Sequence, residues 1–337
     1  MKAIGFKTSL PITERDSFIE FETEVPRAEG HDLLVKIKAI SVNPVDFKIR
    51  QNAAKDTVLD EPKVIGWDAC GVVEAVGDEV TLFKKGDEVY YAGDINRSGS
   101  NAEYQLIDER ITGKKPVSLS YAEAAAMPLT TVTAWEILFD RIRINPERDK
   151  GRTLLIIGGA GGVGSIAIQL AKMIAGLTVI ATASRPESIQ WCKELGADVV
   201  VDHKNLVGAV HQAGFKEVDF ILDFVDTAAY WDAMAELIKP QGHIASITGA
   251  GTPVALNKLK SKSVSFSWEY MYTRSSFQTA DMQEQHNILN RTAALLDQGI
   301  LKNTLTTTLN GLSAANLKEA HRLQESGKTI GKTVIVL

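Results

Sequence analysis

Residues 153–164 read TLLIIGGAGGVG and join an apolar run to a glycine-rich turn. The run LLIIG, Leu154 to Gly158, is typical of a buried strand, and the residues that follow, GVGSIAIQLAKMIA, are typical of a helix. Between them, Gly159 to Gly164 have the spacing GxGxxG. A turn of this spacing that follows a strand and opens a helix binds the pyrophosphate of a dinucleotide. The stretch therefore predicts a dinucleotide site.

Each residue of this turn has an expected task. Gly159 allows the tight turn, Gly161 lets the backbone approach the pyrophosphate, and Gly164 lets the helix pack closely on the strand. Gly162 and Val163 begin the helix and present N–H groups and a partial positive charge to the phosphates. The alternative is a turn with a structural role only, which would not require the strands that follow.

The chain beyond the turn alternates strands with helices. Apolar β-branched runs predict strands at residues 178–183, 198–203, 218–224 and 243–248. Continuous apolar strands separated by helices indicate a parallel sheet that is buried on both faces. Residues 263–271 alternate polar with apolar side chains and predict a sixth strand at the edge. We therefore expect an α/β domain built on a doubly wound parallel sheet.

The two ends of the chain differ from this central region. Residues 33–42, 71–80 and 86–93 carry short strand signals divided by turn residues, which favours a small β-barrel or sandwich. From Ala122 the composition becomes helical. We expect the ends to pair into one discontinuous domain, with the α/β domain inserted between them. The predicted division is 1–125 with 272–337, and 126–271.

Composition excludes several classes of protein. The 337 residues include 37 basic and 42 acidic side chains, and no run of like charges marks a nucleic-acid surface. Two cysteines form neither a disulfide framework nor a four-thiolate zinc site. Residues 153–183 are mostly apolar, but glycines and Lys172 interrupt them, so no membrane span is expected. Because charges lie at Lys7, Glu14 and Arg15, we expect no signal peptide and a cytoplasmic protein.

The residues after the second predicted strand indicate which dinucleotide binds. An NAD site places an acidic residue there, about 20 residues beyond the first glycines, to accept from the ribose 2′-hydroxyl. This chain has Ser184 and Arg185 instead, and no acid before Glu187. A 2′-phosphate prefers hydroxyl and guanidinium donors, and His203 after the third strand adds a further contact, so NADPH is predicted. The alternative is that Arg185 is a solvated residue at a helix start and His203 only ends a strand.

A resemblance to a known family runs along the whole chain. Seven segments carry it: SVNPVD (41–46), GWDACGVVEAVG (66–77), KKGDEV (84–89), GSNAEY (99–104), AEAAAMPLTTVTAWEIL (122–138), GGAGGVG (158–164) and GKTVIVL (331–337). They resemble the medium-chain dehydrogenase/reductase superfamily, and within it the bacterial zinc-type alcohol dehydrogenase-like proteins of the quinone-oxidoreductase branch. The resemblance implies a GroES-like β-barrel catalytic domain from both termini, a central Rossmann domain, a cleft between them, and a homodimer formed through the last Rossmann strand.

The chain departs from the zinc-dependent members of that family. Those members place a cysteine ligand in the segment that reads SVNPVD here, and Gly-His-Glu where this chain has Gly66-Trp67-Asp68. Their third ligand falls where this chain has Met127-Pro128-Leu129. Because a catalytic zinc needs three protein ligands, we predict no metal site. Cys70 is interpreted as a small buried hydrophobe.

Candidate catalytic residues follow from the metal-free relatives. The resemblance implies that Asn43 lies near the nicotinamide and that Thr133 holds the carboxamide side of the cofactor. Asn43 is then placed to donate to a developing enolate or quinol oxygen, although Asn-Pro is also a turn signal. Asp46 and Tyr104 are further catalytic candidates, and Arg50 is another residue expected at the cleft.

The function expected from these observations is hydride transfer from NADPH to a small molecule. Oxidising an unactivated alcohol is assisted by zinc, whereas a quinone or an α,β-unsaturated carbonyl is already electrophilic. We therefore predict a zinc-free NADPH-dependent oxidoreductase that acts on such acceptors. Two alternatives remain open: an alcohol or aldehyde dehydrogenase with an unusual metal site, and an NADPH-binding sensor without turnover.

Overall fold

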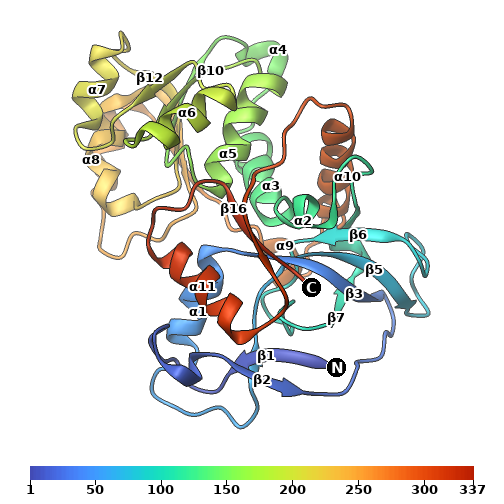
Figure 1. Ribbon diagram of the computed structural model, residues 1–337. Coiled ribbons are helices and arrows are strands. Elements are labelled where there is room, and N and C mark those ends of the chain that lie inside the picture. The colour runs from blue at the N-terminus through green and yellow to red at the C-terminus, as the bar shows by residue number, and fades with distance from the viewer. The chain divides into compact units, whose positions relative to one another are not determined.

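The computed structural model describes residues 1–337, which form two compact units. One unit combines Met1–Val132 with Tyr272–Leu337, and the other is Thr133–Met271 (Figure 1). The division expected from the sequence, after residues 125 and 271, differs from this one by seven residues at the first boundary. We name them the terminal unit and the sheet unit.

The sheet unit contains a six-stranded parallel sheet, as predicted. Its strands have the spatial order β11-β10-β9-β12-β13-β14, and every neighbouring pair is parallel. The strands are β9 (Thr153–Ile157), β10 (Thr178–Thr182), β11 (Val199–Val201), β12 (Val218–Asp223), β13 (Ile238–Ser246) and β14 (Ser265–Trp268). In chain order this sequence of strands is 3-2-1-4-5-6, the Rossmann arrangement. The predicted edge position of the sixth strand is confirmed, because β14 ends the sheet.

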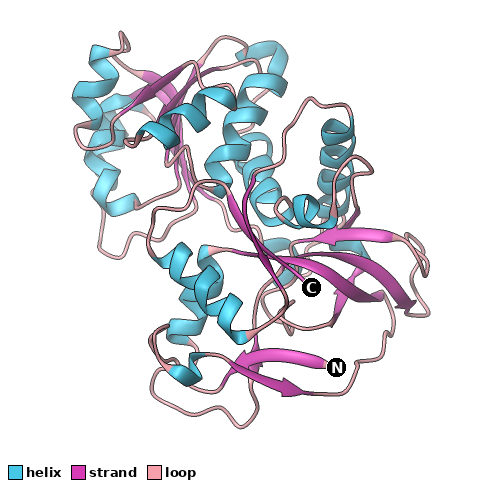
Figure 2. Ribbon diagram, viewed as in Figure 1, coloured by secondary structure: helices cyan, strands magenta, loops and turns pink.

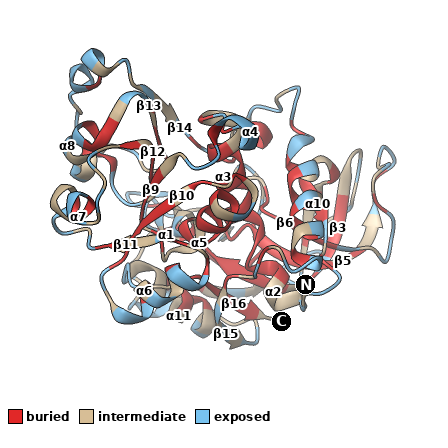
Figure 3. Cartoon of the chain, turned by 90° about the horizontal axis from the view of Figure 1, so that it is seen from above, coloured by how far each residue is buried: buried red, intermediate tan, exposed pale blue.

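Burial explains why these runs form a central sheet. The side chains of Leu154, Ile156, Val179 and Ile221 are fully buried, so both faces of the sheet are covered. Figure 3 shows the central strands β9, β10 and β12 mostly in the red of buried residues. The remaining elements of this unit are α4 (Pro146–Asp149), α5 (Gly162–Gln169), α6 (Pro186–Glu194), α7 (Leu206–Gln212), α8 (Thr227–Leu237), the 3₁₀ turn η5 (Leu256–Lys262), and the π-helical turns η3 (Glu136–Arg141) and η4 (Leu170–Ile174).

The terminal unit is β-rich, as expected, but its strands do not close into a barrel. They form one sheet with the order β15-β16-β3-β5-β6-β8, to which β7 adds by pairing with β3, and a small sheet β2-β1-β4 (Figure 2). A single isolated bridge, Ala3 to Ala102, links β1 to the segment before β7. The larger sheet of this β-rich unit is open, because β8 and β15 end it without pairing with each other. These strands are β1 (Lys2–Phe6), β2 (Ile19–Glu22), β3 (Asp32–Val42), β4 (Lys63–Val64), β5 (Asp68–Val76), β6 (Glu88–Tyr91), β7 (Tyr104–Asp108), β8 (Thr112–Lys114), β15 (Leu305–Asn310) and β16 (Lys332–Val336).

The helical segment that begins near Ala122 is divided into two helices by Pro128. Proline has no N–H to donate and disfavours helical backbone in the residue before it, so α2 (Tyr121–Ala125) ends and α3 (Pro128–Trp135) starts at the proline. The other helices of the terminal unit are α1 (Pro44–Asn52), α9 (Thr273–Ser276), α10 (Glu284–Asp297) and α11 (Ala314–Glu325), with 3₁₀ turns η1 (Arg15–Ser17) and η2 (Glu109–Ile111). None of the helices combines the length and the apolar composition that crossing a bilayer requires.

Candidate functional site

The glycine turn of the sheet unit connects the end of β9 to the start of α5. The tight turn predicted at Gly159 is made by Gly158, whose φ of +91° lies in the left-handed region. A Cβ on Gly159 would lie 2.8 Å from the Cβ of Ala181, and one on Gly164 would lie 2.2 Å from the Gly158 carbonyl oxygen. Both positions are therefore glycine because the chain packs tightly there. At Gly161 the nearest atom to a Cβ is 3.7 Å away, so the fold itself leaves room at this position.

The N-terminus of α5 has the properties of an anion site. Gly161 is its N-cap residue, no side chain caps the helix, and its first turn contains no acidic residue. Gly161, Gly162 and Val163 are each partly exposed. Unpaired N–H groups at an accessible helix N-terminus attract phosphate, both through hydrogen bonds and through the helix dipole. This end of the helix is thus available to the pyrophosphate of a dinucleotide.

A buried carboxylate organises the loops beside this turn, and the sequence reasoning missed it. Asp223, the last residue of β12, accepts hydrogen bonds from the Val225 N–H at 3.0 Å and from the hydroxyls of Thr227, Ser246 and Thr248 at 3.0, 3.1 and 3.2 Å. Because β12 lies next to β9, these loops are at the point where the strand order reverses, which is where open α/β sheets bind ligands. The signal in the sequence that could have indicated this group is the set of polar residues at the ends of the predicted strands 218–224 and 243–248, namely Asp223, Ser246 and Thr248.

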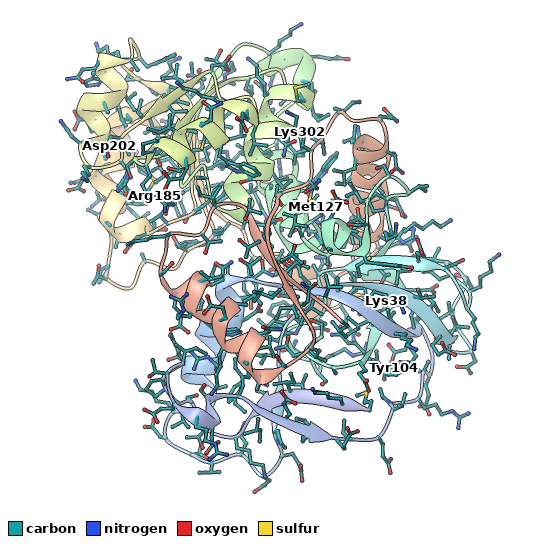
Figure 4. The ribbon with its side chains drawn as sticks, viewed as in Figure 1. Lys38, Tyr104, Met127, Arg185, Asp202 and Lys302 are labelled. Carbon is teal, nitrogen blue, oxygen red and sulfur yellow. The ribbon has the colours of Figure 1, made fainter.

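The residues expected to recognise a 2′-phosphate lie at the carboxyl ends of β10 and β11, at the same edge of the sheet as the glycine turn that follows β9. Since β10 and β11 pair in parallel, Ser184 and Arg185 after β10 are near His203 after β11. Arg185 and His203 have side chains that are each 40% exposed (Figure 4 labels Arg185). Arg185 lies 3.4 Å from the Glu187 carboxylate, and His203 lies 3.7 Å from the Asp202 carboxylate. The sequence reasoning did not consider Asp202, an acid next to these donors.

The terminal unit contains a buried polar cluster of Asn43, Asp46, Asp68 and Lys332, whose side chains are at most 2% exposed. Lys332 Nζ lies 3.0 Å from Asp68 Oδ2 and also donates to Asn43 Oδ1. The Asn43 amide donates to Asp68 Oδ2 at 2.8 Å. The sequence reasoning identified Asn43 and Asp46 but missed Asp68 as a functional group and Lys332 altogether, because up to 289 residues separate the partners.

Asp46 has an unusual position within this cluster. As the third residue of α1, it accepts the Asn43 N–H through Oδ2 at 2.7 Å, while its Oδ1 has no partner. Complete burial raises the pKa of the Asp46 carboxyl to about 7, and nearby Asp68 adds to the rise, whereas Lys332 opposes it. The carboxyl therefore carries a proton in a substantial fraction of molecules near neutral pH.

The other sequence candidates do not join the cluster. Tyr104, labelled in Figure 4, lies opposite Lys36 of β3. Lys36 precedes Asn43 by seven residues, so Tyr104 lies about 20 Å from Asn43 along the direction of β3. Arg50 is fully buried and forms an ion pair with Glu325 of α11. Thr133 is buried in α3 and is the first residue of the sheet unit.

Comparison with known proteins assigns the chain to a family. A family model described as the alcohol dehydrogenase GroES-like domain matches residues 29–135, and one described as zinc-binding dehydrogenase matches residues 162–285. A zinc-type alcohol dehydrogenase-like protein of Staphylococcus epidermidis is 46% identical over 340 residues, covering 100% of both chains. The chain belongs to the medium-chain dehydrogenase/reductase superfamily. It is an oxidoreductase that uses a nicotinamide cofactor and acts on a small molecule.

Further relatives of this medium-chain oxidoreductase cover different parts of it. A Rhizobium etli protein classed with the zinc-dependent alcohol dehydrogenases has a TM-score of 0.95 and 48% identity, covering 100% of this chain and 98% of that one. A mycobacterial protein solved with NADPH has a TM-score of 0.84 and 26% identity, with 100% of both chains covered. The 2-methylene-furan-3-one reductase of Solanum lycopersicum is 37% identical over 244 residues, which are 70% of this chain and 59% of that protein.

The name of the matching family model raises the question of zinc. In this medium-chain oxidoreductase, the three segments that resemble the ligand segments of zinc enzymes meet at Asn43, Asp68 and Leu129. The Leu129 N–H and the Lys332 ammonium are hydrogen-bond donors, and both point to the Asp68 carboxylate. Zinc requires three electron-pair donors, so these residues do not fit it. Nowhere in residues 1–337 do three His, Cys, Asp or Glu side chains gather closely enough to share a metal ion.

Proposed function

We propose that this protein is a zinc-free reductase that transfers hydride from NADPH to a quinone or an α,β-unsaturated carbonyl. The observation that carries the proposal is the ammonium of Lys332, which occupies the space between Asn43 and Asp68. The ammonium binds the oxygen atoms of Asn43 and Asp68 that a metal ion would need, and its positive charge repels such an ion. Acceptors of this class are electrophilic without a Lewis acid, and the enone reductase among the relatives uses such a substrate.

NADPH supplies the hydride, and the chain supplies binding sites for it. The free N–H groups of Gly162 and Val163 hold the pyrophosphate, with Gly161 allowing its close approach. Ser184, Arg185 and His203 contact the 2′-phosphate. Thr133 holds the carboxamide of the nicotinamide.

The chain also supplies a proton. When hydride reaches the acceptor, a carbonyl oxygen or an adjacent carbon gains negative charge and then takes up a proton. Asp46 holds a transferable proton because burial raises the pKa of its carboxyl to about 7, and its Oδ1 has no other partner. Asn43 orders the backbone at this point, since its own N–H binds Asp46 Oδ2. We assign Asp46 as the proton donor and Asn43 as a residue that stabilises the developing oxyanion. Tyr104, on β7 opposite Lys36 of β3, has no step in this scheme.

The proposal is tested by the oxidation of NADPH and of NADH with an ortho-quinone and with a simple enone, before and after treatment with a strong chelator. Turnover that prefers NADPH and survives the chelator supports it. Turnover that is lost with the chelator contradicts it and identifies a metal-dependent dehydrogenase. Tight NADPH binding without turnover of either acceptor also contradicts it and identifies a sensor.

We further propose that the protein is a cytoplasmic homodimer that pairs through β14. This strand ends the sheet, so one row of its backbone groups has no strand partner, and Trp268 on it is 50% exposed. Light scattering checks the dimer. A Trp268→Glu substitution is expected to produce the monomer, and a monomeric parent protein would contradict the proposal.

A further inference from the structure

Lys332 is held by three acceptors in the interior of the terminal unit. Its ammonium donates to the Val42 carbonyl oxygen at 3.2 Å, to Asp68 Oδ2 at 3.0 Å, and to Asn43 Oδ1. An ammonium has three N–H groups, so each is used once. The side chain is 1% exposed and Asp68 is 0% exposed, which makes this a fully buried ion pair.

The two charges fix the orientation of the Asn43 carboxamide. Its oxygen accepts from the ammonium, and its nitrogen donates to the Asp68 carboxylate at 2.8 Å. A rotation by 180° would place the amide nitrogen against the ammonium and the amide oxygen against the carboxylate, and both contacts are repulsive. The remaining Asn43 N–H donates to the Ser41 carbonyl oxygen, with 3.5 Å between Asn43 Nδ2 and that oxygen, at the limit of a hydrogen bond.

Asp68 also binds the beginning of α3. Its Oδ1 accepts the Leu129 N–H at 2.7 Å, in the first turn of that helix. A carboxylate at a helix N-terminus satisfies a free N–H and interacts favourably with the helix dipole. The ion pair of Lys332 and Asp68 thus orders two parts of the chain. One is the side chain of Asn43, directly after β3, and the other is α3, the helix that contains Thr133.

We propose that Lys332 and Asp68 are positioning residues for the reduction: their buried ion pair holds the Asn43 carboxamide in one orientation and fixes the start of α3. The assignment rests on the proposed reductase function. The competing explanation is that the pair stabilises the fold and does nothing for turnover. A buried pair is costly to break but often neutral to replace as a whole, and this asymmetry separates the two explanations.

The experiment compares Lys332→Met, Asp68→Asn and the double variant with the parent protein. Each single variant leaves a buried charge without its partner and is expected to unfold at a lower temperature. The double variant removes both charges and is expected to recover most of the lost thermal stability. Its kcat with an ortho-quinone is expected to stay about 100-fold below the parent value, with KM for the quinone and Kd for NADPH within threefold.

A matched control uses an exposed ion pair of the same unit. Lys85 and Glu74 lie 2.7 Å apart with side chains 69% and 44% exposed, so Lys85→Met with Glu74→Gln is expected to change neither stability nor kcat. A double variant of the buried pair that recovers both stability and kcat would overturn the positioning role.

A second readout does not depend on turnover. In protein labelled with ¹⁵N-asparagine, the Asn43 side-chain amide is assigned with an Asn43→Ser variant, and its proton signals are expected to lie away from those of exposed asparagines because one N–H donates to the Asp68 carboxylate. These signals are expected to shift in the double variant of the buried pair and to keep their positions in the exposed-pair control. Unchanged signals in the buried-pair variant would contradict the fixed orientation. If the parent protein reduces no acceptor, the proposed function fails, and the amide signals alone decide the positioning claim.

Discussion

The glycine turn and the buried polar cluster differ in whether their polar groups already have hydrogen-bond partners within the chain. At the start of α5, the backbone N–H groups are exposed, uncapped and free of nearby acidic side chains. Around Lys332, by contrast, charged and amide groups are buried and bound to one another. The first region is ready to receive an anion, whereas the second already contains its own cation and anion.

This difference predicts which substitutions impair cofactor binding at the turn and which destabilise the cluster. The turn depends on empty space, so added volume should damage it while charge changes elsewhere should not. The cluster depends on balanced charge, so the loss of one charge should damage it more than a change of size.

Breaking the buried pair is expected to have the largest effect. Asp68→Ala leaves the Lys332 ammonium without its carboxylate and removes the hydrogen bond from the Leu129 N–H to Asp68 Oδ1. We expect the free energy of unfolding to fall by about 3–5 kcal/mol, as for other buried pairs that lose one partner. Urea denaturation measures it, with Glu74→Ala on the exposed pair as the control. A loss under about 1 kcal/mol would mean that the cluster does not depend on charge balance.

Added volume in the turn is expected to abolish cofactor binding without unfolding the protein. A Cβ at Gly161 meets no chain atom closer than 3.7 Å, so Gly161→Val should fold and yet block the pyrophosphate. We expect Kd for either dinucleotide to rise more than about 100-fold, which corresponds to about 2.8 kcal/mol. Fluorescence titration measures Kd. Gly164→Ala is the contrasting variant, because its Cβ would lie 2.2 Å from a carbonyl oxygen and should lower thermal stability. Retained binding in Gly161→Val would refute the role of the turn.

We propose that Arg185 extends the anion site from backbone to side chain. Arg185→Ala is expected to weaken NADPH binding by about 1.5–3 kcal/mol, the range for a hydrogen bond to a charged group, while NADH binding stays nearly constant. Calorimetric titration with both cofactors measures the difference. The matched control is Arg152→Ala, in the same unit but paired with Asp149 and Asp219. An equal loss for both cofactors would contradict NADPH selection.

The smallest effect concerns a second buried charge group, in the sheet unit. Burial and the neighbouring Glu136 raise the pKa of Glu269 to about 9, although Arg141 lies 2.7 Å from it and opposes the rise. The folded protein thus keeps a proton that the unfolded chain releases above its ordinary pKa of 4.5, and stability falls as the pH rises from about 4.5 to about 9.

Glu269→Gln removes this titration. Its free energy of unfolding relative to the parent should therefore increase by on the order of 1 kcal/mol between pH 5 and pH 6. Urea denaturation at the two pH values measures the change. A relative stability that does not vary with pH would show that Glu269 is ionised in the folded protein.

The sheet and the glycine turn were predictable because their signals are local. The runs that begin at Leu154, Val179 and Phe220 are apolar on consecutive residues, and the turn is a six-residue motif directly after a strand. Whether the larger sheet of the β-rich unit is open or closed was not predictable, since it depends on whether the outer strands β8 and β15 meet. Lys332 was missed for the same reason: its partner Asp68 is 264 residues away, and only the pairing of β16 with β3 brings it near.

The position of Lys332 in β16 has a consequence for the order of events during synthesis. Asp68 leaves the ribosome 264 residues before the lysine that neutralises it, which takes about 13–50 s at usual elongation rates. All of Thr133–Met271 emerges during this interval. The dinucleotide-binding unit is thus translated in full before the other unit receives its last strand, and during that time Asp68 and Asn43 must remain hydrated. The terminal unit is completed last, when its two distant ends join.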